Sequence, residues 1–174
     1  MKRYIVMTFL LAFAALCAVA QGNRVYIDDF EIYPDSTVTV PVVLANVEQS
    51  RGLQFHMSLP EGLTVKKYEL TDHSLDCDMK IIMSSDDAHK NYKVLLYSLT
   101  CSFFPCDTAA IMMIRFKADP GFKGGSIVLR KVNSSTMENK MLHMPDNATI
   151  VTVPEAELIG IPIDSKTSKD GFFN

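Results

Sequence analysis

The sequence of 174 residues contains no tryptophan and none of the common catalytic signatures. A Gly-x-Ser-x-Gly elbow, a phosphate-binding loop and a His-Glu-x-x-His helix are all absent, and the four histidines lie in unrelated segments. These absences predict a protein that is not an enzyme and that uses no cofactor. Without tryptophan, and with its tyrosines scattered, the chain also offers no evident aromatic platform for sugars.

Positive charge is also scarce. The formal net charge is -3, and it falls to -5 if residues 1–20 are removed, because they hold two basic residues and no acidic one. This acidity argues against nucleic acid and anionic membrane surfaces as partners. The one long apolar run is shorter than the roughly 20 residues that a bilayer span requires, so we expect no membrane span.

Residues 1–20 have the three parts of a secretory signal peptide: two basic residues, an apolar run and a small-residue motif that ends at Ala20. We predict cleavage before Gln21 and export to the periplasm, the cell surface or the extracellular space. A lipid anchor on Cys17 stays open as an alternative.

Apolar and polar residues alternate along most of residues 21–153, which is typical of strands with one buried face. The clearest case is the apolar series Leu53, Phe55, Met57 and Leu59. The pattern predicts nine strands, at residues 24–32, 38–44, 53–59, 63–70, 79–84, 92–99, 109–117, 126–133 and 148–153. Turn-forming residues separate them, so the sequence predicts an all-β sandwich.

Three segments need separate interpretation. Pro41 has no amide to donate, which predicts a sheet edge or a bulge there. The unbroken apolar run of residues 109–116 could form a helix, but its length and flanks favour a buried strand. Residues 154–174 lose the alternation and are expected to form a linker or tail.

Four pieces of the chain follow one another in a characteristic order. Residues 34–42 place a proline and an acidic residue before alternating threonine and valine, and residues 46–63, 110–118 and 148–153 supply later strands and a turn. Across residues 25–153 this layout resembles the cohesin-like modules, which are related to some carbohydrate-binding β-sandwiches.

The resemblance implies a nine-stranded jelly-roll β-sandwich that binds a small calcium-loaded dockerin module through one sheet face. It therefore implies a noncatalytic role for this chain in binding a dockerin-like protein partner. Two alternatives stay open: a carbohydrate-binding module that recognises a polysaccharide in a glycan-utilisation system, and a structural component of a cell-surface assembly.

The strands at 79–84 and 92–99 are expected to form a hairpin with its turn centred near His89. In that register Met79 opposes Leu99, and Cys77 opposes Cys101 in an exported protein where disulfides persist. We therefore predict a Cys77–Cys101 disulfide. The alternative bond joins Cys101 to Cys106.

The same register predicts an exposed apolar patch on one side of the hairpin, centred on Ile82, Val94 and Leu96. Together with Gln54 and His56 on the polar side of the 53–59 strand, these three residues form the predicted binding site. The alternative is that a loop or the tail covers the patch.

A cluster of potential metal ligands lies between two predicted strands, at Asp72, His73, Asp76, Cys77 and Asp78. It lacks the spacing and the glycine of a calcium-binding loop, so we expect a solvated acidic loop and no metal.

Overall fold

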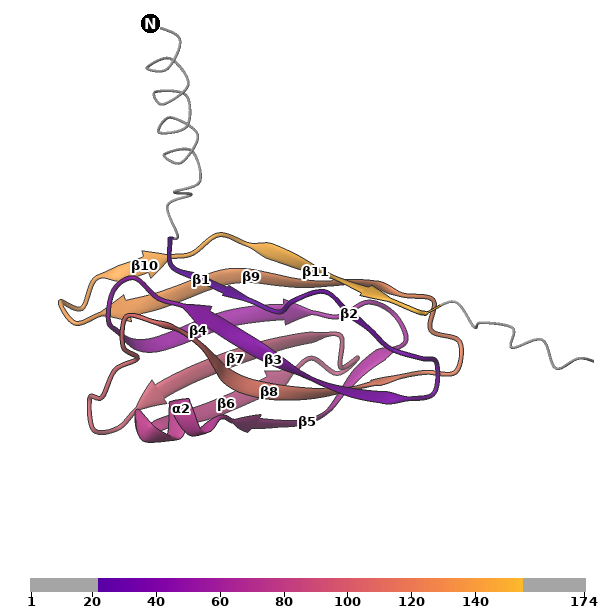
Figure 1. Cartoon of the computed structure of the whole chain (residues 1–174), viewed down its shortest axis with the longest axis horizontal. Helices are drawn as coiled ribbons and strands as arrows, with labels where there is room; N and C mark the ends of the chain where they lie inside the picture. The colour runs from indigo at the N-terminus through magenta and orange to yellow at the C-terminus, as the bar shows by residue number, and fades with distance from the viewer. Residues whose placement is uncertain (1–21, 155–174) are drawn as a thin grey trace, which may run out of the picture.

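The computed structural model describes residues 22–154. The predicted signal peptide, and the predicted tail beyond Pro154, lie outside the described residues. The described part of the chain forms two β-sheets packed face to face, with one short helix (Figure 1). The predicted β-sandwich is confirmed.

The smaller sheet has four strands in the order β1-β3-β8-β5 and is antiparallel throughout. Its strands are β1 (Arg24–Tyr26), β3 (Thr37–Ala45), β8 (Thr108–Ala118) and β5 (Leu63–Leu70). The run that could have been a helix is thus the central strand β8, because both of its edges are paired.

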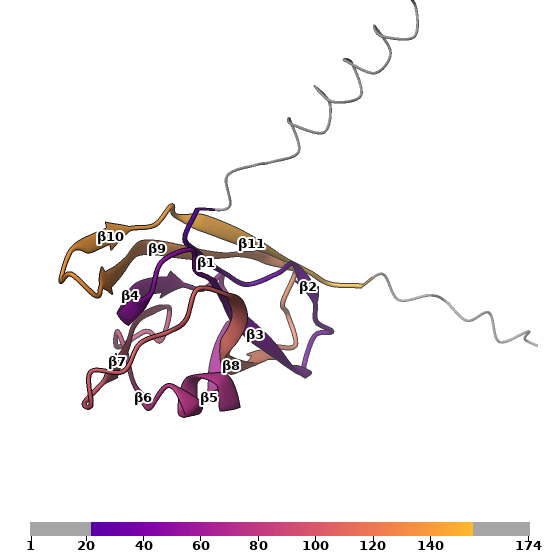
Figure 2. The ribbon, with the colours of Figure 1, turned by 60° about the vertical axis from the view of Figure 1, so that its left-hand side comes forward.

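The larger sheet has seven strands, with the order β2-β11-β9-β4-β7-β6 and with β10 paired to β9. Its strands are β2 (Phe30–Glu31), β11 (Asn147–Thr152), β9 (Gly125–Thr136), β4 (Ser50–Ser58), β7 (Asn91–Ser98), β6 (Met79–Ser85) and β10 (Met141–His143). Strands β9 and β10 form a hairpin (Figure 2). Strand β2 pairs in parallel with β11, whereas the other pairs in this sheet are antiparallel.

The described residues contain eleven strands, so the predicted number of nine is wrong. The predicted strand at residues 24–32 is two strands in different sheets, since β1 pairs with β3 and β2 pairs with β11 (Figure 1). Strand β10 was missed because it has only three residues. The expected acidic loop holds the helix α2 (Asp72–Asp76), which spans five residues.

The inward faces of the two sheets share one hydrophobic core. Phe55 and Met57 of β4 meet residues of β8 such as Ile114 and Phe116, and all four side chains are fully buried. Each such side chain contributes about 1.5–3 kcal/mol relative to an exposed one. Phe30 extends the core at the β2 edge, where its ring stacks on Phe116 with centroids 5.8 Å apart.

Pro41 lies on β3, which has neighbours on both sides, yet it does not interrupt the sheet. Strand β1 pairs only with Val43 to Ala45, so at Pro41 the sole ladder partner is Met113 of β8. The register also shifts between Val42 and Val43. The expectation of an edge or bulge therefore holds locally.

The predicted register of the β6–β7 hairpin is wrong by one residue. Met79 pairs with Ser98, and Met83 pairs with Val94. The turn explains the shift, because Asp86 accepts hydrogen bonds from the amides of Lys90 at 2.8 Å and Asn91 at 3.2 Å. A shift of one residue moves every β7 side chain to the opposite face.

The predicted disulfide is not formed, and Cys77, Cys101 and Cys106 are all free thiols. Pairing in the observed register begins at Met79 and Ser98. Cys77 is the C-cap of α2, and Cys101 lies in the connection between β7 and β8 with a φ of 61°. The two cysteines therefore lie outside the paired ladder that was expected to place them opposite each other.

Candidate binding face

The solvent-facing side of β6, β7, β4 and β9 is called here the outer face. The observed register aligns its side chains in rows that cross the four strands. In the order β6, β7, β4, β9, the three rows are Lys80–Tyr97–Gly52–Ser135, Ile82–Leu95–Gln54–Asn133 and Ser84–Lys93–His56–Arg130.

Three of the five predicted binding residues lie on the outer face. Gln54 and His56 are half-buried, and Ile82 is 51% exposed. The placement of Val94 and Leu96 on this face is wrong, because both side chains are 0% exposed in the core. The shifted register causes the error.

Leu95 and Tyr97 are the outward residues of β7 that the sequence interpretation missed. Val94, Leu95 and Leu96 are three successive apolar residues, so alternation alone could not tell which of them points outward. The missing signal was the turn, in which Asp86 fixes the spacing of the hairpin.

A hollow of about 370 Å³ lies on the outer face over Gly52 and is called here the Gly52 hollow. Leu95, Tyr97 and Met141 give it apolar walls, and Met141 is 65% exposed. A Cβ atom added at Gly52 would lie 3.1 Å from the carbonyl oxygen of Leu96. Gly52 therefore leaves room for the backbone of β7, and its own backbone, which carries no side chain, forms the floor of the hollow.

The Ser84–Lys93–His56–Arg130 row, which lies next to this apolar area, carries basic side chains. His56 lies between Lys93 of β7 and Arg130 of β9, and the adjacent Lys131 is also exposed. Burial, followed by the charges of Lys131 and Lys93, lowers the pKa of His56 below its ordinary value of 6.5. The neighbouring charges therefore make a positive region on an otherwise acidic protein.

The face carries no compensating carboxylates on its strands. The sequences of β4, β6, β7 and β9 contain no aspartate or glutamate. Asp78, next to β6, accepts a hydrogen bond from Thr100 at 2.6 Å and forms an ion pair with Lys80 at 3.3 Å. Asp86 is occupied by the amides of its own turn.

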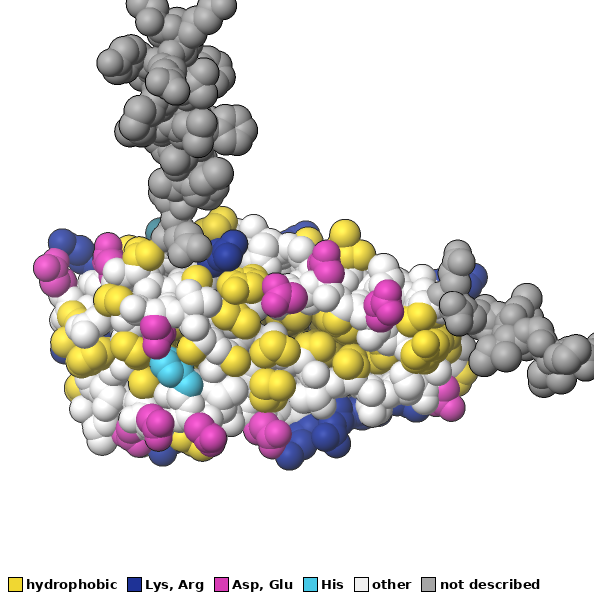
Figure 3. Space-filling model, viewed as in Figure 1, with side chains coloured by type: hydrophobic (Ala, Val, Ile, Leu, Met, Phe, Trp, Pro, Cys, Tyr) yellow, Lys and Arg dark blue, Asp and Glu magenta, His cyan; other side chains and the backbone are white. Residues whose placement is uncertain are grey.

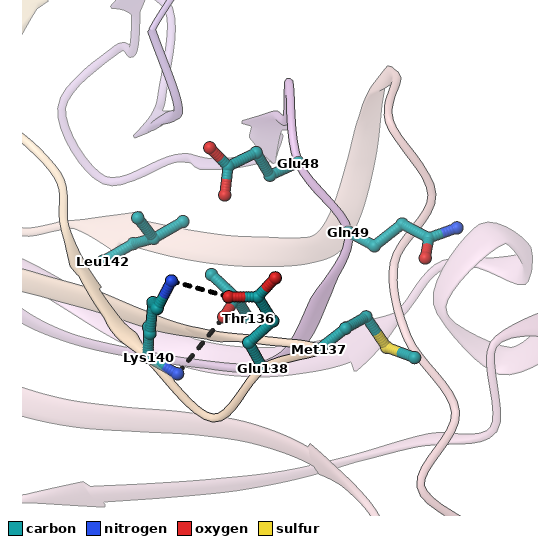
Figure 4. Close-up of a pocket in the computed structure, with 7 residues that line it drawn as sticks. All are labelled: Glu48, Gln49, Thr136, Met137, Glu138, Lys140 and Leu142. Atoms are coloured by element: carbon teal, nitrogen blue, oxygen red, sulfur yellow. Dashed lines mark hydrogen bonds and ion pairs between the residues drawn. The ribbon is translucent and has the colours of Figure 1, made fainter.

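A second hollow, of about 560 Å³, lies between the β3–β4 loop and the other side of the β9–β10 hairpin (Figure 4). It is lined by Glu48, Gln49, Thr136, Met137, Glu138, Lys140 and Leu142. Glu138 forms an ion pair with Lys140 at 2.6 Å. No group of three potential metal ligands occurs among the described residues, here or near α2.

The opposite side of the sandwich is also partly apolar. Hydrophobic side chains form a band across the middle of the molecule over β3, with acidic side chains around it (Figure 3). On this sheet, Lys67 bonds Glu69 and Lys117 bonds Asp35, both at 2.5 Å. In residues 22–154 there is no helix with the length and hydrophobicity needed to cross a membrane.

The architecture matches many solved cohesin structures. A non-cellulosomal cohesin from Archaeoglobus fulgidus is 11% identical with a TM-score of 0.60, over 75% of this chain and 91% of that one. The chain has the cohesin fold.

Two cohesins solved in complex with dockerins are equally similar. The cohesin–dockerin complex of type I from Clostridium thermocellum gives 14% identity and a TM-score of 0.61, over 76% of this chain and 99% of that one. The sixth cohesin of scaffoldin B from Acetivibrio cellulolyticus, bound to a Cel5 dockerin, gives 15% and 0.62 over the same shares. No protein-family model matches the chain, and no curated protein matches it.

Proposed function

We propose that this protein is an exported, noncatalytic binding module that docks a protein partner on its outer face. The observation that carries the proposal is the apolar area formed by Ile82, Leu95 and Tyr97 around the Gly52 hollow. Ile82 is 51% exposed, Leu95 and Tyr97 are half-buried, and polar and basic residues border the area, which is the composition of many protein interfaces.

The cohesin fold supports the same function. Two of the matching cohesins were solved with a dockerin bound, so a dockerin-like module is the first partner to test. The N-terminal sequence, with its signal-peptide pattern at residues 1–20, supports export. The absence of catalytic motifs from the sequence supports a noncatalytic role.

Ile82 and Ile150 provide a matched pair for the test. Both are isoleucines on the solvent side of the larger sheet, and they are 51% and 54% exposed. Ile82 lies on the outer face, whereas Ile150 lies on β11, beyond β9. The two replacements with aspartate therefore add the same charge at similar exposure.

The experiment is a pull-down with the purified protein against proteins and polysaccharides from its own source, with and without calcium. We expect the unchanged chain and Ile150→Asp to retain a protein partner that Ile82→Asp no longer retains. A retained protein that is insensitive to Ile82→Asp contradicts the docking face. Retention on a polysaccharide alone supports the carbohydrate-binding alternative, and no retention on either supports a structural component.

A further inference from the structure

We propose that the partner docked on the outer face presents an acidic segment, with carboxylates that pair with Arg51 and with the Lys93–His56–Arg130 row. An apolar side chain of the same segment occupies the Gly52 hollow. This inference rests on the proposed docking function and names the chemistry of the partner.

The positive charge of the outer face is unbalanced. Lys93 and Arg130 are exposed and form no ion pair with any described residue, and the strands that carry them have no acidic residue. The protein as a whole is acidic, so the positive charge of this row is a local feature. Complementary charge across an interface selects partners and accelerates their association.

Arg51 lies at the edge of the Gly52 hollow. Its Nε is shielded from solvent and has no hydrogen-bond partner among the described residues. Its Nη1 donates only a long bond, 3.4 Å, to Oδ1 of Asn139. A buried donor without a partner is unfavourable, and a carboxylate is the group that a guanidinium binds best. A partner carboxylate at the hollow would pair with the guanidinium of Arg51, whose Nη1 makes only this long bond.

The positions of these groups set the spacing of the segment. Gly52 and His56 are four residues apart on β4, which corresponds to roughly 13 Å. An extended peptide covers that distance with about four residues and a helix with about nine. The partner segment therefore carries one carboxylate beside its apolar residue, where it meets Arg51. It carries others within roughly 13 Å of that residue, where they meet the Lys93–His56–Arg130 row.

The apolar walls favour a peptide over an anionic polysaccharide as the occupant. Leu95, Tyr97 and Met141 surround the Gly52 hollow, and two of the three are aliphatic. An acidic sugar chain has no apolar side chain to bury there, whereas a leucine-sized side chain gains from leaving water.

The test is a selection of random peptides of 16 residues, displayed on phage, against the purified protein and two charge variants. Lys93→Glu/Arg130→Glu reverses the basic row. Lys66→Glu/Lys123→Glu makes the same change of net charge at two exposed lysines outside the outer face. Ile82→Asp and Leu95→Asp report whether a selected peptide binds at the proposed face. Polygalacturonate serves as the anionic polysaccharide probe.

We expect the unchanged protein to select peptides in which aspartate and glutamate outnumber lysine and arginine around an apolar residue. The affinity of these peptides should fall by about tenfold or more in Lys93→Glu/Arg130→Glu and stay within about twofold in Lys66→Glu/Lys123→Glu. It should also weaken between about 50 mM and about 500 mM salt.

Peptides that lose binding in Leu95→Asp but show no acidic excess would overturn the acidic partner and leave docking intact. Failure to select any peptide, or selection of peptides indifferent to both apolar variants, would contradict docking itself. Binding of polygalacturonate that is lost in Lys93→Glu/Arg130→Glu, without peptide binding, would replace the acidic protein with an anionic polysaccharide.

Discussion

Ile82 of β6 lies directly across from Leu95 of β7, and both residues are on the solvent side of the sheet. One position farther along β7, Leu96 pairs with Ile81 and is fully buried. Two consecutive leucines therefore have opposite environments. The outer face depends on which of them points to solvent.

This pair gives the first prediction. Leu96→Asp places a charge in the core; truncation of a buried leucine already costs about 2–5 kcal/mol, and a charge costs more, so we expect the protein to unfold. Leu95→Asp should change the free energy of unfolding by about 1 kcal/mol or less, since the side chain is half-buried on the surface. Urea denaturation of both variants checks this, and equal destabilisation would contradict the observed register.

The second prediction concerns the pKa of His56. Because burial, Lys131 and Lys93 lower it, the folded protein binds fewer protons than the unfolded chain just below pH 6.5. The free energy of unfolding should therefore decrease as the pH falls through this region, and His56→Gln should remove that part of the decrease. The charged groups on the neighbouring strands are Lys93, Arg130 and Lys131.

An NMR titration measures this pKa directly. We expect a value below 6.5 that rises in Lys131→Gln and, by a smaller amount, in Lys93→Gln. A titration at or above 6.5 in the unchanged protein would show that the basic row exerts no such field.

The third prediction concerns the turn before β9. Gly124 has a φ of 89°, and a Cβ atom there would lie 2.8 Å from the carbonyl oxygen of Val151. Gly124→Ala should lower the free energy of unfolding by about 1–3 kcal/mol, since both the backbone conformation and the contact are unfavourable. Gly121 has open space around its Cα, so Gly121→Ala should stay within about 0.5 kcal/mol. Thermal denaturation compares the two, and a neutral Gly124→Ala would contradict the described turn.

The fourth prediction concerns the thiols. Cys101 and Cys106 are exposed and should react first with iodoacetamide. Cys77 should react more slowly, because burial and then the carboxylates of Asp107 and Asp76 raise its pKa and reduce its thiolate fraction. Peptide mapping by mass spectrometry identifies the labelled sites, and a cross-linked Cys77–Cys101 peptide would show that the disulfide forms after all.

The sequence was a good guide to the strands and a poor guide to their register. Alternation identified β4 and its inward residues Phe55 and Met57, because a strand with one buried face repeats every two residues. The same rule failed on β7, where three successive apolar residues allow either face. The hydrogen bonds of Asp86 resolve the ambiguity, and they depend on side-chain geometry that residue types alone do not specify.

The binding site was predicted in part for the same reason. Gln54, His56 and Ile82 were placed on the correct side of their strands, whereas Leu95, Tyr97 and the Gly52 hollow became visible only with the correct pairing. The basic row joins His56 to Arg130, which is 74 positions later in the sequence. Such a juxtaposition follows from the strand order of the sheet and has no local signal in the chain.

The parallel pairing of β2 with β11 determines how the domain would respond to force. A pull on the chain before Phe30, opposed by a pull beyond Thr152, acts along these two strands in opposite directions. The ladder between them, and the bond from the amide of Ile32 to the carbonyl of Thr152, would then be loaded in shear, with all hydrogen bonds strained together. Tension applied at the two ends of the domain would load the β1–β3 ladder, which precedes β2 in the chain, and then this short parallel pair.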